Sequence, residues 1–221
     1  MINRNYYIRQ SGLIDATKLN FPILVVGAGG IGGWTTLALC KMGCQDVRIE
    51  DFDVVEEHNL GSQLFSRSQI GMDKAAALWE SVSNLAENPP RYFKHRVQNR
   101  EAITGRHGIV ISAVDNMESR RAIFDGIAET KYFIDGRMAG NAIQIYTIKI
   151  DNLDDVGFYK STLFSDDQAD QVPCSERAVI YNVFVVAGLI TDIVAQIANG
   201  LRPPRELVVD LRNFTLHGGL I

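Results

Sequence analysis

The chain has 221 residues, of which 46% are hydrophobic and 22% charged, so it has enough apolar content for the buried core of a globular protein. Its net charge of −4 lacks the basic excess that nucleic-acid binding requires, so we expect no nucleic-acid partner. The three cysteines have no repeated spacing, which argues against a disulfide framework. The amino terminus is polar, which argues against a signal peptide. The apolar run at 183–190 is too short to span a bilayer, which argues against a membrane anchor. We therefore expect a cytoplasmic protein.

Residues 1–20 form an arm ahead of the first predicted strand. The arm is polar and aromatic around Arg9, and residues 15–19 favour a short helical turn. From its position alone, Arg9 is interpreted as a solvated surface arginine.

The stretch 21–53 has the order strand, glycine turn, helix, strand and acid. Glycines allow a tight turn and the close approach of a phosphate, and the amino end of the helix offers free N–H groups to an anion. Asp51, followed by Asp53, stands where a ribose-binding carboxylate is found in such units. The pattern predicts an adenine nucleotide but does not separate NAD, FAD and ATP. The glycines of the turn are Gly27, Gly29, Gly30 and Gly32.

Residues 54–65 are polar and rich in amide side chains, which suits a loop or short helix over the carboxyl ends of the strands. Lys74 then opens a helix whose apolar residues keep helical spacing as far as residue 85. A cation at the amino end of a helix opposes the helix dipole, and a phosphate facing Lys74 would remove the conflict. A plain surface lysine is the alternative.

Further strands are predicted at 91–98, 108–114, 131–135 and 142–150. The continuous apolar run at 108–114 is typical of a parallel strand that is covered on both faces. Asp115 and Asn116 follow it at its carboxyl end, on the side where a ligand would bind. Asn116 also suits the amino-terminal cap of a helix that runs through Arg120.

Residues 151–171 are acidic and irregular, and they predict a flexible crossover loop that ends near Cys174. Residues 181–198 form an almost wholly apolar helix, which we expect to be buried, and residues 206–216 supply one or two terminal strands. The predicted fold class is α/β. It has a Rossmann-like nucleotide-binding half with a largely parallel sheet, continued by antiparallel strands in the carboxy-terminal half.

The ordered motifs resemble the ThiF/MoeB/ubiquitin-activating-enzyme (HesA/MoeB/ThiF) superfamily over nearly the whole chain. They are the glycine string at 27–32, Asp51-x-Asp53, Asn59-Leu60-x-x-Gln63, Gly71-x-x-Lys74 and Asp115-Asn116 with Arg120, flanked by Arg9-Gln10 and Pro173-Cys174. The resemblance implies a single ThiF-type adenylation domain over 1–221. Its parts would be an arm (1–20), a nucleotide-binding core (21–150), a flexible crossover loop (151–177) and a carboxy-terminal helix with strands (178–221).

The chemistry implied by the resemblance is ATP-dependent adenylation. The C-terminal carboxylate of a ubiquitin-like or sulfur-carrier β-grasp protein would attack the α-phosphate of ATP and release pyrophosphate. Because carboxylate and triphosphate repel each other, catalysis needs charge neutralisation and alignment. The resemblance makes Lys74 the neutralising cation and Asp115 the Mg2+ ligand, with Asp53 as a helper. It also implies a homodimer in which Arg9 reaches into the neighbouring subunit's site.

The resemblance further assigns the residues that hold the nucleotide. These are the backbone of Gly27, Gly29, Gly30 and Gly32, the ribose ligand Asp51, the phosphate donors Asn59 and Gln63, and Asn116 and Arg120, which would shape the pocket.

Two departures from the family pattern stand out. Ser62 replaces the arginine of the usual Asn-Leu-x-Arg-Gln motif, and Arg67 is a candidate substitute. The paired Cys-x-x-Cys zinc knuckles of many members are absent, so we expect no zinc site and interpret Cys40 and Cys44 as buried small apolar residues. The thiolate of Cys174 would take the activated carboxyl as a thioester or exchange sulfur with it, before a conjugating enzyme or sulfur donor acts. A helix-start cysteine without chemistry is the alternative, because some members work by adenylation alone.

Three other functions fit parts of the pattern. The chain would adenylate a peptide or other small carboxylate, or a modified tRNA base, although the acidic balance weighs against tRNA. An NAD-dependent oxidoreductase would use the same glycine turn, but no catalytic Tyr-x-x-x-Lys or histidine constellation supports it. A nucleotide-binding scaffold that has lost its chemistry is suggested by Ser62.

Overall fold

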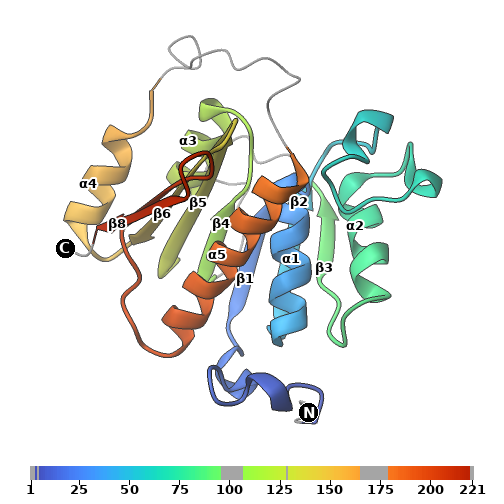
Figure 1. Cartoon of the computed structure of the whole chain (residues 1–221), viewed down its shortest axis with the longest axis horizontal. Coiled ribbons are helices and arrows are strands. Elements are labelled where there is room, and N and C mark those ends of the chain that lie inside the picture. The colour runs from blue at the N-terminus through green and yellow to red at the C-terminus, as the bar shows by residue number, and fades with distance from the viewer. Residues whose placement is uncertain (1–2, 4, 96–106, 128, 165–178, 220–221) are drawn as a thin grey trace.

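The computed structural model describes residues 3, 5–95, 107–127, 129–164 and 179–219. Its helices and strands follow the chain in the order shown in Figure 1. They are β1 (Pro22–Val26), α1 (Gly30–Met42), β2 (Asp46–Asp51), α2 (Lys74–Ser83), β3 (Arg91–Lys94), β4 (Ile109–Ser112), α3 (Met117–Gly126), β5 (Tyr132–Ala139), β6 (Ala142–Lys149), α4 (Leu153–Ser161), α5 (Ile180–Ala198), β7 (Glu206–Asp210) and β8 (Thr215–Gly219). Short 3-10 helices are η1 (Ile8–Gln10), η2 (Ala16–Lys18), η3 (Glu57–Asn59) and η4 (Arg67–Gln69).

Within the described ranges the strands form one eight-stranded sheet in the order β3-β2-β1-β4-β5-β6-β7-β8. The pairs from β3 to β5 are parallel, and the pairs from β5 to β8 are antiparallel. The predicted fold class, a largely parallel nucleotide-binding half continued by antiparallel strands, is therefore confirmed.

Helices cover both faces of the sheet, which explains the apolar runs in its central strands. Ile23 and Val25 of β1 point toward the core around α1, α2 and α5, whereas Leu24 and Val26 point toward the core around α3 and α4. This alternation is the two-residue period of a strand with both faces buried.

The apolar helix α5 lies side by side with α1 in front of the sheet (Figure 1). It has 19 residues and is long and apolar enough to cross a membrane by length and composition, so the argument that its apolar run is too short is wrong for the whole helix. In the structure, Val183, Val186 and Ile190 are buried, and the last two join the core formed with α1. Packing against a neighbouring helix, rather than length, accounts for the apolar character of this face.

One predicted loop contains a helix. The stretch 151–177 was expected to be irregular because it is acidic, but residues Leu153–Ser161 form α4. The side chain of Asn152 caps this helix by accepting hydrogen bonds from the N–H groups of Asp154 and Asp155, and Tyr159 anchors it in the core with no exposed surface. Residues 165–178, including Cys174, lie outside the described residues.

The strand order places the glycine turn at the position where ligands of open α/β sheets bind. The chain leaves β1 toward β2 on one side, while β4 pairs with β1 on the other side. The carboxyl ends of β1 and β4 therefore flank a point where the winding reverses. The glycine turn follows β1, and Asp115 follows β4 at the same edge.

Candidate nucleotide site

The glycine turn has the geometry that the sequence predicts. Gly27 has a φ of +100°, and a Cβ at this position would lie 2.6 Å from the carbonyl oxygen of Ala113. At Gly32 a Cβ would lie 1.8 Å from the carbonyl oxygen of Gly27. Both glycines are therefore needed so that α1 and the turn after β4 can pack against the end of β1.

Gly29 has a different reason to lack a side chain. It caps the amino end of α1 without any side-chain hydrogen bond, and the nearest atom to a Cβ there would be Nε2 of Gln63 at 3.9 Å. The first N–H groups of a helix have no partner within the helix. The amino end of α1 thus presents donors to a surface that a side chain would cover, which is the arrangement that binds phosphate.

Asp51 shapes this turn directly. Its Oδ2 accepts a 2.6 Å hydrogen bond from the N–H of Ala28, and its Oδ1 accepts a 2.7 Å bond from the N–H of Asp53. The carboxylate is buried, and burial raises the pKa of Asp51 although both backbone bonds lower it. Each carboxylate oxygen has a second lone pair. Asp51 can therefore hold the turn and still accept a ribose hydroxyl, the role implied by the resemblance.

Lys74 has a partner that the sequence did not reveal. Its Nζ lies 3.0 Å from Oδ2 of Asp53, and its backbone N–H donates to the carbonyl of Asp53 at 2.9 Å. The Lys74 side chain is only 11% exposed. The predicted conflict between this cation and the dipole of α2 is thus relieved by a carboxylate within the chain, and Asp53 holds the ammonium at the carboxyl end of β2.

The two amide residues lie on the segment that follows. Asn59 is buried, and its Oδ1 accepts a 2.9 Å bond from the N–H of Glu56, which caps η3. The N–H of Gln63 donates to the carbonyl of Asn59 at 2.9 Å, so η3 positions Gln63 near Gly29. Oε1 of Gln63 is buried and has no hydrogen-bond partner among the described residues. Asn59 is therefore first a structural cap, and Gln63 is the amide that borders the candidate site.

The residues of interest after β4 are two exposed side chains and one buried arginine. Asp115 and Asn116 are exposed, and Nδ2 of Asn116 donates to Oδ1 of Asp115 at 3.1 Å. Asn116 also caps α3 by accepting from the N–H of Ser119 at 2.8 Å. Arg120 is only 5% exposed, and its guanidinium faces the buried Asp135. Burial directs this side chain to the interior, which is compatible with the implied role of shaping the pocket, and the part of Arg120 in cofactor binding stays a prediction.

Arg9 lies far from the turn in its own chain. It is exposed on η1, and the neighbouring Gln10 donates from Nε2 to the carbonyl of Met42, the last residue of α1. The amino-terminal arm thus lies at the opposite end of α1 from Gly29 (Figure 1). Arg9 does not complete the site of its own chain, and its action across a subunit interface stays a prediction.

Cys40 and Cys44 are buried as predicted, and burial raises the pKa of Cys40 to about 12. Arg67 is exposed on η4, and its replacement of the family arginine stays a prediction. The backbone carbonyl of Ser62 accepts a hydrogen bond from Nε1 of Trp34 at 3.1 Å.

A buried charged network that the sequence did not reveal lies beside the carboxyl end of β4. The carboxylate of Asp135 has no exposed surface and lies 2.7 Å from Nε of Arg137, 3.2 Å from Nε of Arg120 and 3.0 Å from the hydroxyl of Tyr159. Burial raises the pKa of Tyr159, and the charge of Asp135 raises it further. The available signal was an acid inside the otherwise apolar start of β5.

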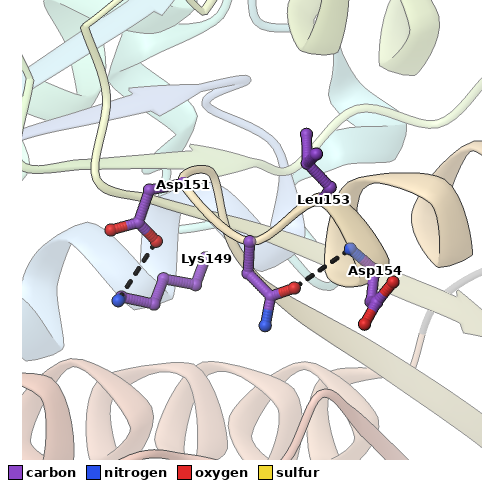
Figure 2. Close-up of a pocket in the computed structure, with 5 residues that line it drawn as sticks. Lys149, Asp151, Leu153 and Asp154 are labelled. Carbon is purple, nitrogen blue, oxygen red and sulfur yellow. Dashed lines mark hydrogen bonds and ion pairs between the residues drawn. The ribbon is translucent and has the colours of Figure 1, made fainter.

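A shallow hollow of about 480 Å³ lies elsewhere, at the turn between β6 and α4. Figure 2 shows its lining, in which Lys149 pairs with Asp151 at 3.1 Å. Lys149 lies beside Tyr132 at the beginning of β5, so this hollow is at the amino-terminal edge of the parallel strands, away from the glycine turn. It is open and lined by mostly polar side chains together with Leu153, and it is separate from the candidate site.

Comparisons with known proteins agree with this arrangement. The chain is 28% identical over 142 residues to ubiquitin-like modifier-activating enzyme 5 of Dictyostelium discoideum, covering 56% of this chain and 37% of that protein. It is 32% identical over 130 residues to the probable adenylyltransferase/sulfurtransferase MoeZ of Mycobacterium tuberculosis, covering 56% and 33%. A crystal structure of E. coli MccB with AMPCPP and MccA is similar over 98% of this chain and 71% of that chain, with a TM-score of 0.70 and 16% identity.

These similarities have different weight. At 16% identity the likeness to MccB supports the fold alone. The matched segments span only about a third of the length of the two curated relatives, so their activities as whole proteins do not transfer directly. A model of the ThiF family matches residues 4–217 and thus covers both the glycine turn and the antiparallel half of the sheet. The chain belongs to the ThiF family.

Proposed function

We propose that this chain is an ATP-dependent adenylyltransferase. It transfers AMP to the C-terminal carboxylate of a ubiquitin-like or sulfur-carrier protein and releases pyrophosphate, in the cytoplasm and as a homodimer. The observation that carries the proposal is the uncapped amino end of α1 beside Gln63, whose donor atom Nε2 would lie 3.9 Å from a Cβ at Gly29. Family membership supports the reaction, because relatives that share the matched segment are described as activating enzymes and adenylyltransferases.

The residues present fit a magnesium nucleotide. Gly27 and Gly32 hold the turn, Gly29 leaves it open, and α1 directs N–H groups at its mouth. Mg2+ is commonly held by one or two carboxylates together with substrate phosphates, and the exposed carboxylate of Asp115 at this edge suits that role. When bound, the ion neutralises phosphate charge. Asp115 would hold it, with Asp53 as a helper.

The protein's own residues would act mainly by neutralisation and orientation. Lys74, fixed by Asp53, brings a nearly buried ammonium to the edge where the triphosphate would lie. Gln63 and the amino end of α1 donate hydrogen bonds that orient phosphate oxygens. Pre-positioned charges of this kind stabilise a transition state without reorganising during the reaction. Arg9 of the second subunit would add a further cation.

A pyrophosphate-exchange assay with purified chain and candidate β-grasp carriers tests the proposal. We expect carrier-dependent exchange of labelled pyrophosphate into ATP, abolished by Lys74→Ala and by Asp115→Ala. Lys94→Ala is the matched control, because Lys94 also pairs with an acid, Asp73 at 2.7 Å, but its side chain is 57% exposed. No exchange with any carrier, peptide or small carboxylate would refute adenylation, whereas exchange with a peptide alone would replace the carrier as substrate.

Nucleotide choice has a separate test. A thermal melt with MgATP or NADH compares the two ligands on the same protein, because a ligand that binds only the folded state raises the melting temperature. We expect MgATP to raise it and NADH to leave it unchanged. The opposite result would favour an NAD-dependent oxidoreductase.

Cys174 is proposed to act after adenylation. Its thiolate would attack the carbonyl of the acyl adenylate, forming a C–S bond as the C–O bond to AMP breaks, before a conjugating enzyme or sulfur donor acts. Thiolates rather than thiols are the nucleophiles in such reactions. We expect a thiol-labile adduct between the wild-type chain and its carrier, which Cys174→Ser abolishes. Full product from Cys174→Ser would make the residue dispensable for chemistry.

A further inference from the structure

Asp135 is a fully buried carboxylate that lies between two arginines. Its Oδ1 is 3.2 Å from Nε of Arg120, and its Oδ2 is 2.7 Å from Nε of Arg137. The hydroxyl of Tyr159 donates to Oδ2 at 3.0 Å. Carboxylates are rarely buried unless they are paired, because removal from water is costly. Because burial of Asp135 carries this desolvation cost beside the candidate site, we expect the carboxylate to have a function there.

The position of Asp135 along the sheet points to the turn after β4. Asp135 is the register partner of Ser112, the last residue of β4, and β5 continues beyond that point to Ala139. Asp135 therefore lies level with the start of the turn that leads through Ala113 to Asp115.

Arg120 connects the buried carboxylate to that turn. Its NH2 donates to the carbonyl of Gly136 at 3.3 Å, and its NH1 reaches the carbonyl of Asn116 at 3.5 Å. Asn116 caps α3 and donates from Nδ2 to Oδ1 of Asp115 at 3.1 Å. A continuous series of contacts thus runs from Asp135 through Arg120 and Asn116 to the carboxylate of Asp115.

We propose that Asp135 is a positioning residue that, through Arg120, fixes the turn carrying Asp115 in the orientation that binds Mg2+. This inference rests on the proposed function, since it presumes that Asp115 holds the ion. Asp135 itself is buried and touches neither nucleotide nor metal. Loss of a residue that orients a metal ligand commonly weakens metal binding by about 10- to 100-fold.

The second arginine provides a built-in control. Arg137 binds the same carboxylate, but its NH1 and NH2 donate to the carbonyl and Oγ1 of Thr162 at 3.1 and 3.2 Å, just after α4. Removing Arg137 therefore disturbs the network and the protein's stability without acting on the contacts to Asn116. If the network acts on Mg2+ binding through Asn116, loss of the Arg120 contacts should weaken Mg2+ binding, whereas loss of Arg137 should not.

The first experiment measures ATP binding by calorimetry as a function of Mg2+ concentration and needs no carrier protein. For Asp135→Asn we expect the half-saturating Mg2+ concentration to rise at least about tenfold, the lower end of the usual effect of losing such an orienting partner. For Arg137→Gln we expect the half-saturating Mg2+ concentration to change by less than about twofold, even if the melting temperature falls as much as in Asp135→Asn. Equal shifts in both variants, or none in Asp135→Asn, would overturn the proposal.

Arg120→Lys gives a second route if Asp135→Asn does not fold. Lysine keeps the charge opposite Asp135 but lacks the planar fork that reaches two carbonyls at once. We expect a folded protein with a raised half-saturating Mg2+ concentration. A folded Arg120→Lys protein with wild-type Mg2+ dependence would refute the positioning role.

Hydrogen exchange on the protein without nucleotide separates this inference from the proposed function. We expect faster amide exchange at 113–120 in Asp135→Asn and in Arg120→Lys than in Arg137→Gln. If the wild type does not bind MgATP at all, the proposed function and the metal role both fail, while exchange still reports whether Asp135 orders the turn. If the wild type binds MgATP and exchange at 113–120 is unchanged in every variant, only the positioning role fails.

Discussion

Oδ2 of Asp51 accepts a 2.6 Å hydrogen bond from the backbone N–H of Ala28, so the acid at the end of β2 holds the turn that follows β1. The second oxygen of the carboxylate accepts from Asp53, whose own carboxylate holds Lys74 at 3.0 Å. One side chain therefore links the glycine turn to the cation that we propose for neutralising phosphate. Disturbing Asp51 should affect stability and nucleotide binding together.

We expect Asp51→Ala to lower the free energy of unfolding by about 3 kcal/mol, because it leaves the buried N–H of Ala28 without its charged acceptor. Chemical denaturation gives this value. Asp46→Ala is the control, since Asp46 also lies on β2 but forms an exposed ion pair with Arg91, worth no more than about 1 kcal/mol. Similar losses in the two variants would show that Asp51 does not have the structural role assigned here.

The glycines of the turn should separate folding from binding. A Cβ at Gly32 would lie 1.8 Å from the carbonyl oxygen of Gly27, so we expect Gly32→Ala to destabilise the protein by about 3 kcal/mol or more. Gly29 has a φ of −73° and only Gln63 near a Cβ, so Gly29→Ala should change stability by less than about 1 kcal/mol.

The same pair should behave differently toward ATP. We expect Gly29→Ala to keep its melting temperature but to bind ATP at least about tenfold more weakly, because the methyl group covers the amino end of α1. Calorimetric titration at saturating Mg2+ measures the affinity. Unchanged affinity in Gly29→Ala would place the nucleotide elsewhere.

Local patterns in the sequence were sufficient for the glycine turn and the parallel strands. Gly27 and Gly32 are required by backbone contacts between neighbouring elements, which the order strand, turn and helix already implies. The partner of Lys74 was not predictable in this way. Asp53 is 21 residues away and meets Lys74 only because α2 starts at the end of β2. The sequence showed an unfavourable cation but not the carboxylate that compensates it.

Tertiary packing accounts for features that local sequence patterns did not predict. The acidic composition around α4 predicted a loop. The segment is helical because Asn152 caps its amino end and Tyr159 packs into the apolar core on this face of the sheet. The resemblance implied that Arg120 shapes the nucleotide pocket, but it named no partner for this side chain. Its direction is set by Asp135 on β5, which no local pattern places nearby. The Asp135 network was missed for the same reason.

Arg9 permits a test that depends on subunit geometry. It lies on the arm at the opposite end of α1 from Gly29, so it can reach a nucleotide site only in another subunit. We expect Arg9→Ala to lower the adenylation rate at least about tenfold while the protein stays dimeric in size-exclusion chromatography.

Mixing variants should then restore activity. A subunit with Arg9→Ala and an intact Lys74 should form a working site with the arm of a Lys74→Ala subunit. Random exchange of equal amounts gives half mixed dimers with one working site each, so about a quarter of wild-type activity should return. The Arg9→Ala protein mixed with itself is the control. Absence of recovery after proven subunit exchange would mean that Arg9 does not act across the interface.

Glu50 should make stability depend on pH in a direction opposite to that of an ordinary paired carboxylate. It is buried on β2, and burial raises its pKa, although His95, with Nδ1 at 3.6 Å, and Arg48 lower it. A raised pKa in the folded state means that folding favours the protonated acid. Its contribution to stability is thus complete below the ordinary glutamate value and is lost as the pH rises through the folded value.

Glu50→Gln removes this titration while keeping the shape of the side chain. We therefore expect the wild type to lose stability relative to Glu50→Gln as the pH rises from about 4 to about 7, measured as the difference in unfolding free energy from urea titrations. Glu57→Gln, at an exposed position, should give a nearly constant difference over the same range. Because other carboxylates titrate equally in all three proteins, the comparison reports on Glu50 together with its contact to His95. If the wild type instead gained stability relative to Glu50→Gln with rising pH, the charges of His95 and Arg48 would outweigh burial.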